Sequence, residues 1–262
     1  MKLLLFLVLI TTSQLKAQNL IIAHFDPFDG AKVNNSETVA QMVYKELKSM
    51  GINASLCPLQ TSFEKAYPQL KNCLQNIEAD LVIGLGETGC KLKAEFVGRN
   101  LDKTYGPDNL GVERNNTPII ATGAPYLSLR YPLPQMYCGL STEERKRLNL
   151  SNNAGSFVCN NVAYQMRYFH PEKMVGFIHV PSHFCKNLKQ TNKENSQIIT
   201  KMITVALSTE DNGPYLPHES NSEEIPITKD QLRKASRSVD NKCYQDFYSR
   251  LRRVDSRGFW PF

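Results

Sequence analysis

The stretch ADLVIGLG, residues 79–86, is a short aliphatic run that ends in glycine. Such a run, bounded by turn-forming residues, is typical of a strand buried on both faces of a parallel sheet. Four further stretches indicate strands in the same way: NLIIAHF (19–25), the weaker INASLCPL (52–59), TPIIATG (117–123) and MVGFIHV (174–180). These runs are spread along most of the chain, as the strands of one sheet would be.

Segments in which apolar residues recur three or four positions apart separate these runs and predict helices. They cover residues 36–51, 63–77, 157–168 and 198–207. Ser141 with Glu144 adds the pattern of a capping box before a short polar helix. We therefore predict an α/β domain in which helices sandwich an open, mainly parallel sheet (α/β/α). Ligand sites of such sheets gather at the carboxyl ends of the strands.

Residues 1–17 have the order that is typical of a signal peptide. Lys2 precedes a short apolar run, Leu3–Ile10, and Ala17 is a suitable last residue before cleavage. The run is too short to cross a bilayer, and no later segment is apolar for long enough. We expect an exported protein without a membrane span, which would be secreted, or periplasmic in a bacterial host. A buried first strand is the alternative interpretation of this run.

The character of the sequence changes after residue 207. Residues 208–228 are polar and acidic and contain prolines, which indicates a linker after an α/β domain of residues 18–207. Residues 229–262 form a tail whose apolar residues fall three or four apart, which predicts an amphipathic helix. We expect this helix to pack back onto the domain. Binding to a membrane surface or to a partner is the alternative.

Composition and charge exclude several classes of protein. With 262 residues, 41% of them hydrophobic, the chain is large enough for one sizeable globular domain. The formal net charge is +6, but acidic residues are interspersed with the basic ones. We expect no nucleic-acid partner, because such binding needs a clustered basic stripe. The cysteines and histidines show no zinc-binding spacing, so we expect no metal site.

Cys159 is a candidate nucleophile. The chain has seven cysteines, and an odd count in an exported protein leaves a free thiol or an intermolecular bridge. Cys159 follows the turn at 153–156, where helical periodicity begins. The positive end of a helix dipole favours a thiolate there, and the unpaired N–H groups of the first turn are the donors that an oxyanion needs. A disulfide partner or a small buried residue is the alternative interpretation.

His179 and Glu95 could take part in the same chemistry. His179 ends the strand at 174–180, and Glu95 follows the glycine-containing turn after the strand at 79–86. A Cys–His pair oriented by a third polar group is the general arrangement for acyl transfer to a thiol. Either residue could instead be structural, since such a histidine often bonds a loop carbonyl and a lone glutamate is often solvated.

Five ordered blocks resemble the pyroglutamyl peptidases, a family of cysteine peptidases. The blocks are HFDPFDGAKVNNS (24–36), DLVIGLGETGCKLKAEFVGRNLD (80–102), GPDNLG (106–111) with TGAP (122–125), SNNAGSFVCNNVAYQ (151–165) and GFIHVP (176–181). The resemblance implies an open α/β/α sandwich, no cofactor, and peptides with a blocked N-terminus as substrates. The implied reaction is hydrolysis of the amide bond after an N-terminal pyroglutamyl residue.

The resemblance also assigns roles to single residues. By position, Cys159 matches the nucleophile, His179 the general base and Glu95 the residue that orients the base. The positions that match the wall of the pyroglutamyl pocket are Phe25, Phe28, Phe157 and Val158. Aromatic faces suit a flat, uncharged lactam ring, whereas a charged N-terminal glutamate would pay a high desolvation cost. We further predict that Cys159 is the unpaired cysteine.

Several positions depart from the family pattern. Tyr105 and Phe96 stand where the family has arginines, His24, Asp29 and Glu87 stand at small residues of the family loops, and SHFCKN (182–187) replaces the usual run after the histidine strand. Two alternatives follow from these departures. One is a catalytically inactive exported homologue that binds peptides through the same pocket. The other is a thiol hydrolase with altered N-terminal specificity.

Overall fold

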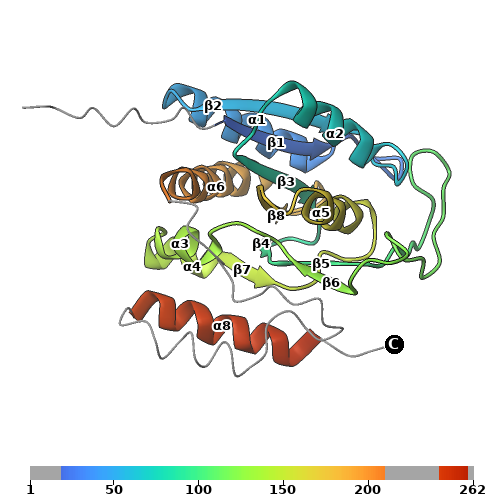
Figure 1. Ribbon diagram of the computed structural model, residues 1–262. Helices are drawn as coiled ribbons and strands as arrows, with labels where there is room; N and C mark the ends of the chain where they lie inside the picture. Colours follow the sequence, from blue (N-terminus) through green and yellow to red (C-terminus); the bar gives the residue numbers. More distant parts are fainter. Residues whose placement is uncertain (1–18, 210–241, 259–262) are drawn as a thin grey trace, which may run out of the picture.

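The computed structural model of the chain describes residues 19–209 and 242–258. The predicted signal peptide lies outside the described residues, as do residues 210–228 of the predicted linker and residues 229–241 and 259–262 of the predicted tail. Figure 1 shows the strands stacked from β2 at the top to β7 near the bottom, with the C-terminal helix α8 beyond them. Among the described residues, no helix is both long and apolar enough to span a bilayer.

Six strands form the main sheet, in the order β2-β1-β3-β8-β4-β7. They are β1 (Asn19–Phe25), β2 (Asn53–Leu59), β3 (Leu81–Glu87), β4 (Leu92–Glu95), β7 (Leu148–Ser151) and β8 (Met174–Val180). β2, β1, β3 and β8 are mutually parallel, β4 runs antiparallel to β8, and β7 is parallel to β4. The predicted open, mainly parallel sheet is therefore confirmed.

Four long helices cover this sheet: α1 (Asn35–Ser49), α2 (Ala66–Asn76), α5 (Val158–Phe169) and α6 (Leu188–Ser208). α1 packs against α6, and α2 packs against α5. Adjacent residues of β3 face the two sides, since position 86 points to α5 while the Glu87 side chain reaches the start of α1. The shorter elements are α3 (Leu133–Cys138), α4 (Thr142–Arg147) and a two-stranded sheet of β5 (Val97–Arg99) and β6 (Tyr126–Ser128).

The core explains why these segments are strands and helices. All seven residues of β3 are buried, as a continuous apolar run predicts for a strand covered on both faces. Asn34 caps the start of α1, because its side chain accepts a hydrogen bond from Ser36 N, and the helix ends before Gly51 at φ +78°. The capping box of Ser141 and Glu144 is confirmed at the start of α4.

Three disulfides cross-link the described chain and leave one cysteine free. Cys57–Cys73 joins β2 to α2, Cys90–Cys185 joins the loops after β3 and β8, and Cys138–Cys243 joins α3 to α8. Cys159 is the unpaired cysteine, which confirms the sequence prediction. In the chain-entropy view each bridge stabilises the fold by about 2–4 kcal/mol, because it restricts the unfolded chain.

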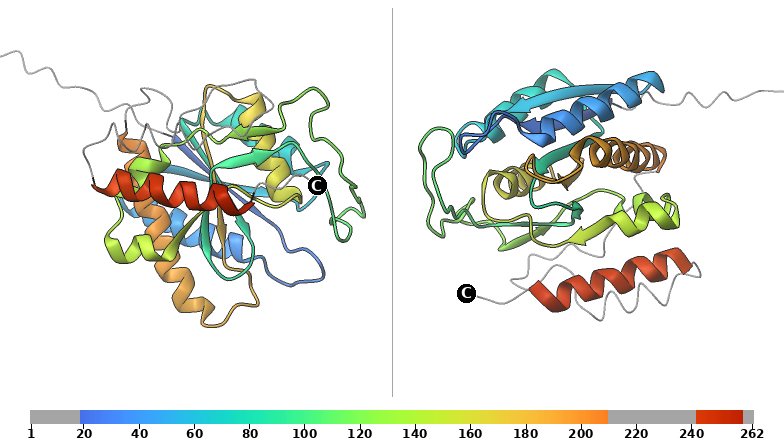
Figure 2. Two further views of the ribbon diagram at one scale, coloured as in Figure 1. Left: turned by 90° about the horizontal axis from the view of Figure 1, so that it is seen from below. Right: turned by 180° about the vertical axis from the view of Figure 1, so that it is seen from behind.

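Helix α8 (Lys242–Gly258) lies within the predicted tail. Its Phe247 and Leu251 are buried, and the Phe247 ring lies 5.4 Å from that of Tyr137. Tyr137 also donates its hydroxyl hydrogen to Asp246 Oδ2 at 2.7 Å. Both Figure 1 and the rear view of Figure 2 place α8 at the end of the molecule beyond β7. The helix thus packs on the domain through α3 and β7.

One predicted strand is absent from the described structure. TPIIATG (117–123) forms only an isolated bridge from Thr117 to Asp102. The Asn100 side chain accepts from Ile120 N and donates to Ile120 O, so the backbone groups of Ile120 are used without a neighbouring strand. The segment is half-buried or exposed, and the prediction was wrong because a short apolar run alone does not supply a pairing partner.

Candidate functional site

Cys159 is the second residue of α5, which places its thiol at the positive end of that helix. Phe157 is the N-cap, and it makes no side-chain capping hydrogen bond. The first N–H groups of α5 therefore remain available to an oxyanion that forms beside the sulfur. The Cys159 side chain is half-buried. The local sequence sets this geometry, because Gly155 at φ +83° turns the chain just before the helix.

His179 and Glu95 form a buried pair beside this thiol. His179 Nδ1 donates to Glu95 Oε1 at 2.9 Å, and the two side chains are 4% and 0% exposed. Tyr131 holds the Glu95 backbone, since its hydroxyl donates to the Glu95 carbonyl oxygen at 2.7 Å. The Cys159 thiol lies beside the His179 ring, where it contributes to raising the pKa of His179. Because Glu95 uses Nδ1, Nε2 is the nitrogen left for the sulfur.

The charge state of His179 follows from its neighbours. Burial alone would lower its pKa, but hydrogen bonds with Cys159 and Glu95 and the negative charges of both raise that pKa from 6.5 to about 9. His179 is therefore an imidazolium at neutral pH. An imidazolium that is held by a carboxylate and lies beside a nucleophilic sulfur is the arrangement of a thiol acyl-transfer site.

Gly86 makes room for this arrangement. It lies on β3 directly opposite His179 on β8. A Cβ atom at position 86 would lie 2.8 Å from Cys159 Sγ and 3.1 Å from His179 Cδ2, which is closer than side chains normally approach. Only glycine allows the strand, the thiol and the imidazole to meet here.

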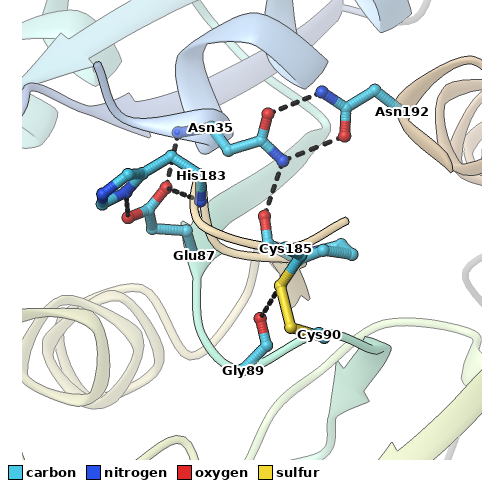
Figure 3. The surroundings of a disulfide bond; sticks show 8 residues. Asn35, Glu87, Gly89, Cys90, His183, Cys185 and Asn192 are labelled. Carbon is cyan, nitrogen blue, oxygen red and sulfur yellow. Dashed lines mark hydrogen bonds and ion pairs between the residues drawn. A yellow bond between two sulfur atoms is a disulfide. The ribbon is translucent and has the colours of Figure 1, made fainter. Parts of the chain in front are cut away.

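A clasp of polar contacts and one disulfide holds the loops after β3 and β8 together (Figure 3). Glu87 Oε2 accepts from the first N–H of α1, at Asn35, at 2.6 Å, and Glu87 Oε1 accepts from His183 Nδ1 at 2.8 Å. The Cys90–Cys185 bridge joins the same two loops on the other side of Gly89. Because the histidine strand leads into one of these loops, the clasp fixes the chain that carries His179.

A cavity of about 870 Å³ opens beside the start of α5. Gly155, Ser156 and Phe157, which precede the helix, form part of its wall, and Phe28 comes from the loop after β1. The rings of Phe28 and Phe157 lie 6.0 Å apart, and Phe63 meets Phe157 edge-on at 5.3 Å. The cavity therefore offers aromatic faces within two residues of the Cys159 thiol.

The pyroglutamyl peptidase family model matches residues 18–210, which is well over half of the chain. The chain belongs to the pyroglutamyl peptidase family. The matched range contains β1 to α6 and every element of the site described above, whereas α8 lies beyond it. The resemblance seen in the sequence blocks is therefore confirmed, and α8 with its disulfide is an addition to the matched domain.

Curated relatives agree with this assignment, and solved structures share the fold. A pyrrolidone-carboxylate peptidase of Staphylococcus carnosus is 33% identical over 168 residues, covering 62% of this chain and 78% of the relative. One from Yersinia pestis is 32% identical over 171 residues, covering 63% and 78%. Pyroglutamyl peptidase I from Bacillus amyloliquefaciens shares the fold with a TM-score of 0.62 at 23% identity, covering 74% of this chain and 97% of that one. Pyrrolidone carboxyl peptidase from Thermococcus litoralis does so with a TM-score of 0.61 at 23% identity, covering 72% and 93%.

The structure separates the four pocket residues implied by the pyroglutamyl peptidase resemblance. Phe28 and Phe157 line the cavity together. Phe25 and Val158 are buried and are not among the residues of its wall, and the Phe25 ring packs 6.3 Å from that of Phe177. The difference follows from their places in the chain, since Phe25 belongs to the buried strand β1 whereas Phe28 stands in the loop after it.

The departures from the pyroglutamyl peptidase pattern have different surroundings. Tyr105 is 95% exposed at the cavity wall, while Phe96 is buried in the core. His24 is also buried, and desolvation lowers its pKa despite the nearby charge of Glu37. Asp29 has φ +53°, in the left-handed region that favours the glycine of the family. None of these side chains displaces Cys159, His179 or Glu95.

Sequence reasoning missed Gly86, the clasp, and two cations in the cavity wall. Gly86 carried a signal, since a glycine inside a buried strand indicates close approach of another group. Glu87 and the SHFCKN segment each depart from the family pattern, but their contact joins positions 96 residues apart and cannot be inferred from either position alone. Arg99 and Lys103 line the cavity beside Leu101, on a segment that gave no functional signal.

Proposed function

We propose that this chain is a cysteine peptidase that releases N-terminal pyroglutamate from peptides, with Cys159 as nucleophile, His179 as general acid and base, and Glu95 as the residue that orients the imidazole. The observation that carries the proposal is the buried His179–Glu95 hydrogen bond with the one unpaired thiol on the same imidazole. Membership of the pyroglutamyl peptidase family supports the substrate.

The first half of the reaction forms a thioester. The Cys159 thiolate attacks the pyroglutamyl carbonyl carbon, a C–S bond forms, and the carbonyl electrons move to oxygen. The first N–H groups of α5 stabilise this oxyanion. His179 then donates its proton to the nitrogen of the leaving amine, and the C–N bond breaks as the carbonyl re-forms.

The second half returns the enzyme to its resting state. Neutral His179 takes a proton from water while the water oxygen attacks the thioester carbon. The C–S bond breaks, pyroglutamate leaves, and Cys159 is again a thiolate beside an imidazolium. Glu95 keeps Nδ1 protonated throughout, so Nε2 alone exchanges protons with sulfur, amine and water.

The experiment is hydrolysis of a pyroglutamyl coumarin amide by the disulfide-bonded protein in a glutathione buffer that keeps Cys159 reduced. The proposal is supported if the protein cleaves the pyroglutamyl amide but not prolyl or glutaminyl amides, and if iodoacetamide abolishes this cleavage. A correctly folded protein without turnover contradicts it in favour of a binding protein. Preference for another N-terminal group contradicts the substrate but retains the thiol hydrolase.

We also propose that the protein is exported. Disulfides form and persist in oxidising compartments, and six of the seven cysteines are paired. Expression of the full chain in a secreting host, with sequencing of the N-terminus, tests this. A secreted product that begins near Gln18 is expected, and retention of residues 1–17 on an intracellular product would contradict it.

A further inference from the structure

One wall of the cavity is formed by every second residue of the segment 99–103, which bends at Asn100. Arg99, Leu101 and Lys103 line the cavity, while the two residues between them turn away. Asn100 bonds the backbone of residue 120, and Asp102 accepts a hydrogen bond from the Asn161 amide at 2.9 Å. These outward contacts fix the segment against the body of the protein. The wall therefore presents two cations on either side of a leucine in a fixed order.

Neither cation has a carboxylate partner in the described part of the chain. Arg99 Nη1 donates to Asn153 Oδ1 at 3.2 Å, which holds the guanidinium with a neutral group. The Lys103 ammonium lies 5.8 Å from the centre of the Tyr105 ring. Both charged groups are positioned without being neutralised, and two such cations in one concavity attract an anion.

Two acidic residues, Asp29 and Asp108, also line the cavity, so its positive charge is local to the segment from Arg99 to Lys103. Asp108 is buried, and its carboxylate already accepts hydrogen bonds from the backbone N–H groups of Phe63, Leu110 and Val112. Asp29 is the exposed anion of the wall and stands on a different segment, the loop after β1. The segment from Arg99 to Lys103 therefore forms a locally positive wall.

The cavity is also larger than the group that the aromatic pair would hold. Pockets of about 300–1,000 Å³ take drug-sized ligands, and a single lactam ring has far fewer atoms. With that ring against Phe28 and Phe157, the rest of the 870 Å³ is open to the residues that follow it. Arg99 and Lys103 line this remaining space.

We propose that Arg99 and Lys103 select substrates in which a residue after the pyroglutamyl group carries a carboxylate. This inference rests on the proposed function and names the class of peptide that the same site prefers. The carboxylate can belong to an acidic side chain or to the C-terminus of a short peptide. Such charge–charge contacts stabilise the bound substrate and the transition state equally, so we expect acidic peptides to have a lower KM and an unchanged kcat.

The test compares four peptides: pyroglutamyl-Ala-Ala amide, pyroglutamyl-Glu-Ala amide, pyroglutamyl-Ala-Glu amide, and pyroglutamyl-Ala-Ala with a free C-terminus. At low salt, kcat/KM for the preferred acidic peptide should exceed that of the neutral amide by about tenfold, the size expected for two half-buried ion pairs. Near 1 M salt the ratio should shrink, because the screening length falls to about 3 Å. Comparison of the three acidic peptides shows whether the preferred carboxylate belongs to the first side chain after the pyroglutamyl group, to the second, or to the C-terminus.

The variants isolate the two cations. Arg99→Gln with Lys103→Gln should bring the acidic-to-neutral ratio below about twofold, and Arg99→Lys should retain most of it. Lys45→Gln removes one exposed charge on α1, outside the cavity, and should leave the ratio unchanged. Asp29→Asn should increase the ratio, because it removes the exposed anion of the wall.

Two results would overturn the inference: equal kcat/KM for all four peptides, or a preference that survives Arg99→Gln with Lys103→Gln. A wild-type protein that cleaves none of the peptides contradicts the proposed function instead. In that case calorimetric binding of the same peptides to Cys159→Ala tests the cationic wall alone. Tighter binding of the acidic peptides is then expected, and equal affinities would reject it.

Discussion

A methyl group at Gly86 is the smallest change that should disable the site. The Cβ of Gly86→Ala would lie 2.8 Å from Cys159 Sγ and 3.1 Å from both His179 Cδ2 and Phe177 Cε1. Unstrained contacts between such atoms occur at about 3.5–4.0 Å, so the thiol must move by about 1 Å. The imidazole has little freedom to follow, because Glu95 holds its other nitrogen.

The magnitude follows from this displacement. Misplacing a reacting group by about 1 Å costs about 10²-fold in rate, while an extra methyl in a packed interior costs about 1–3 kcal/mol of stability. We therefore expect Gly86→Ala to remain folded and to lose about 10²-fold in kcat for a pyroglutamyl coumarin amide. Its rate of alkylation by iodoacetamide should also fall, because the displaced sulfur no longer lies beside the His179 imidazolium.

Gly139→Ala is the matched control. Its Cβ would lie 2.5 Å from Val205 Cγ2, between α3 and α6 and outside the cavity wall. It should lower the free energy of unfolding about as much as Gly86→Ala does but leave kcat unchanged. The reasoning is refuted if folded Gly86→Ala keeps kcat within threefold of the wild type. It is refuted equally if both variants lose the same activity, since the loss would then reflect folding alone.

Three further predictions concern the groups around the thiol. The pKa of His179 is raised from 6.5 to about 9, so the stabilisation by its charge is fully present below pH 6.5 and is lost as the pH rises through 9. In urea titrations, the difference in free energy of unfolding between the wild type and His179→Gln should therefore narrow over that range. A plot of kcat/KM against pH should likewise fall on its alkaline side near pH 9. In Glu95→Gln a neutral amide replaces the carboxylate that holds His179 Nδ1, so kcat should drop by about 10²–10⁴-fold while the protein stays folded. An unchanged kcat would contradict the orienting role of Glu95. Cys90→Ser with Cys185→Ser should lower the free energy of unfolding by about 2–4 kcal/mol and reduce kcat, and a stability loss at full activity would show that the clasp does not position His179.

Much of the fold could be predicted because its signals are local. The buried strands β1, β3 and β8 are continuous apolar runs, and the long helices have clear periodicity. β7 and the β5–β6 pair escaped prediction because strands of three or four residues carry too few alternations to stand out. The run at 117–123 failed for the opposite reason, since it is apolar but has no strand beside it.

The candidate site divides in the same way. Cys159, His179 and Glu95 each stand at a recognisable end of a helix or strand, and the family pattern names all three. Their contacts depend on strand register, however, because Gly86 lies opposite His179 only when β3 and β8 pair in the observed register. The side chain of Glu87 and the inward face of the 99–103 segment depend on long-range packing, which one sequence does not reveal.

The most direct test of the account is to trap the acyl-enzyme. The disulfide-bonded protein is mixed with a pyroglutamyl ester, quenched in acid within the first turnover, digested and analysed by mass spectrometry. The account predicts one pyroglutamyl group, held as a thioester on Cys159 and absent from Cys159→Ala. Steady release of pyroglutamate by Cys159→Ala, or an acyl group on any other residue, would contradict it.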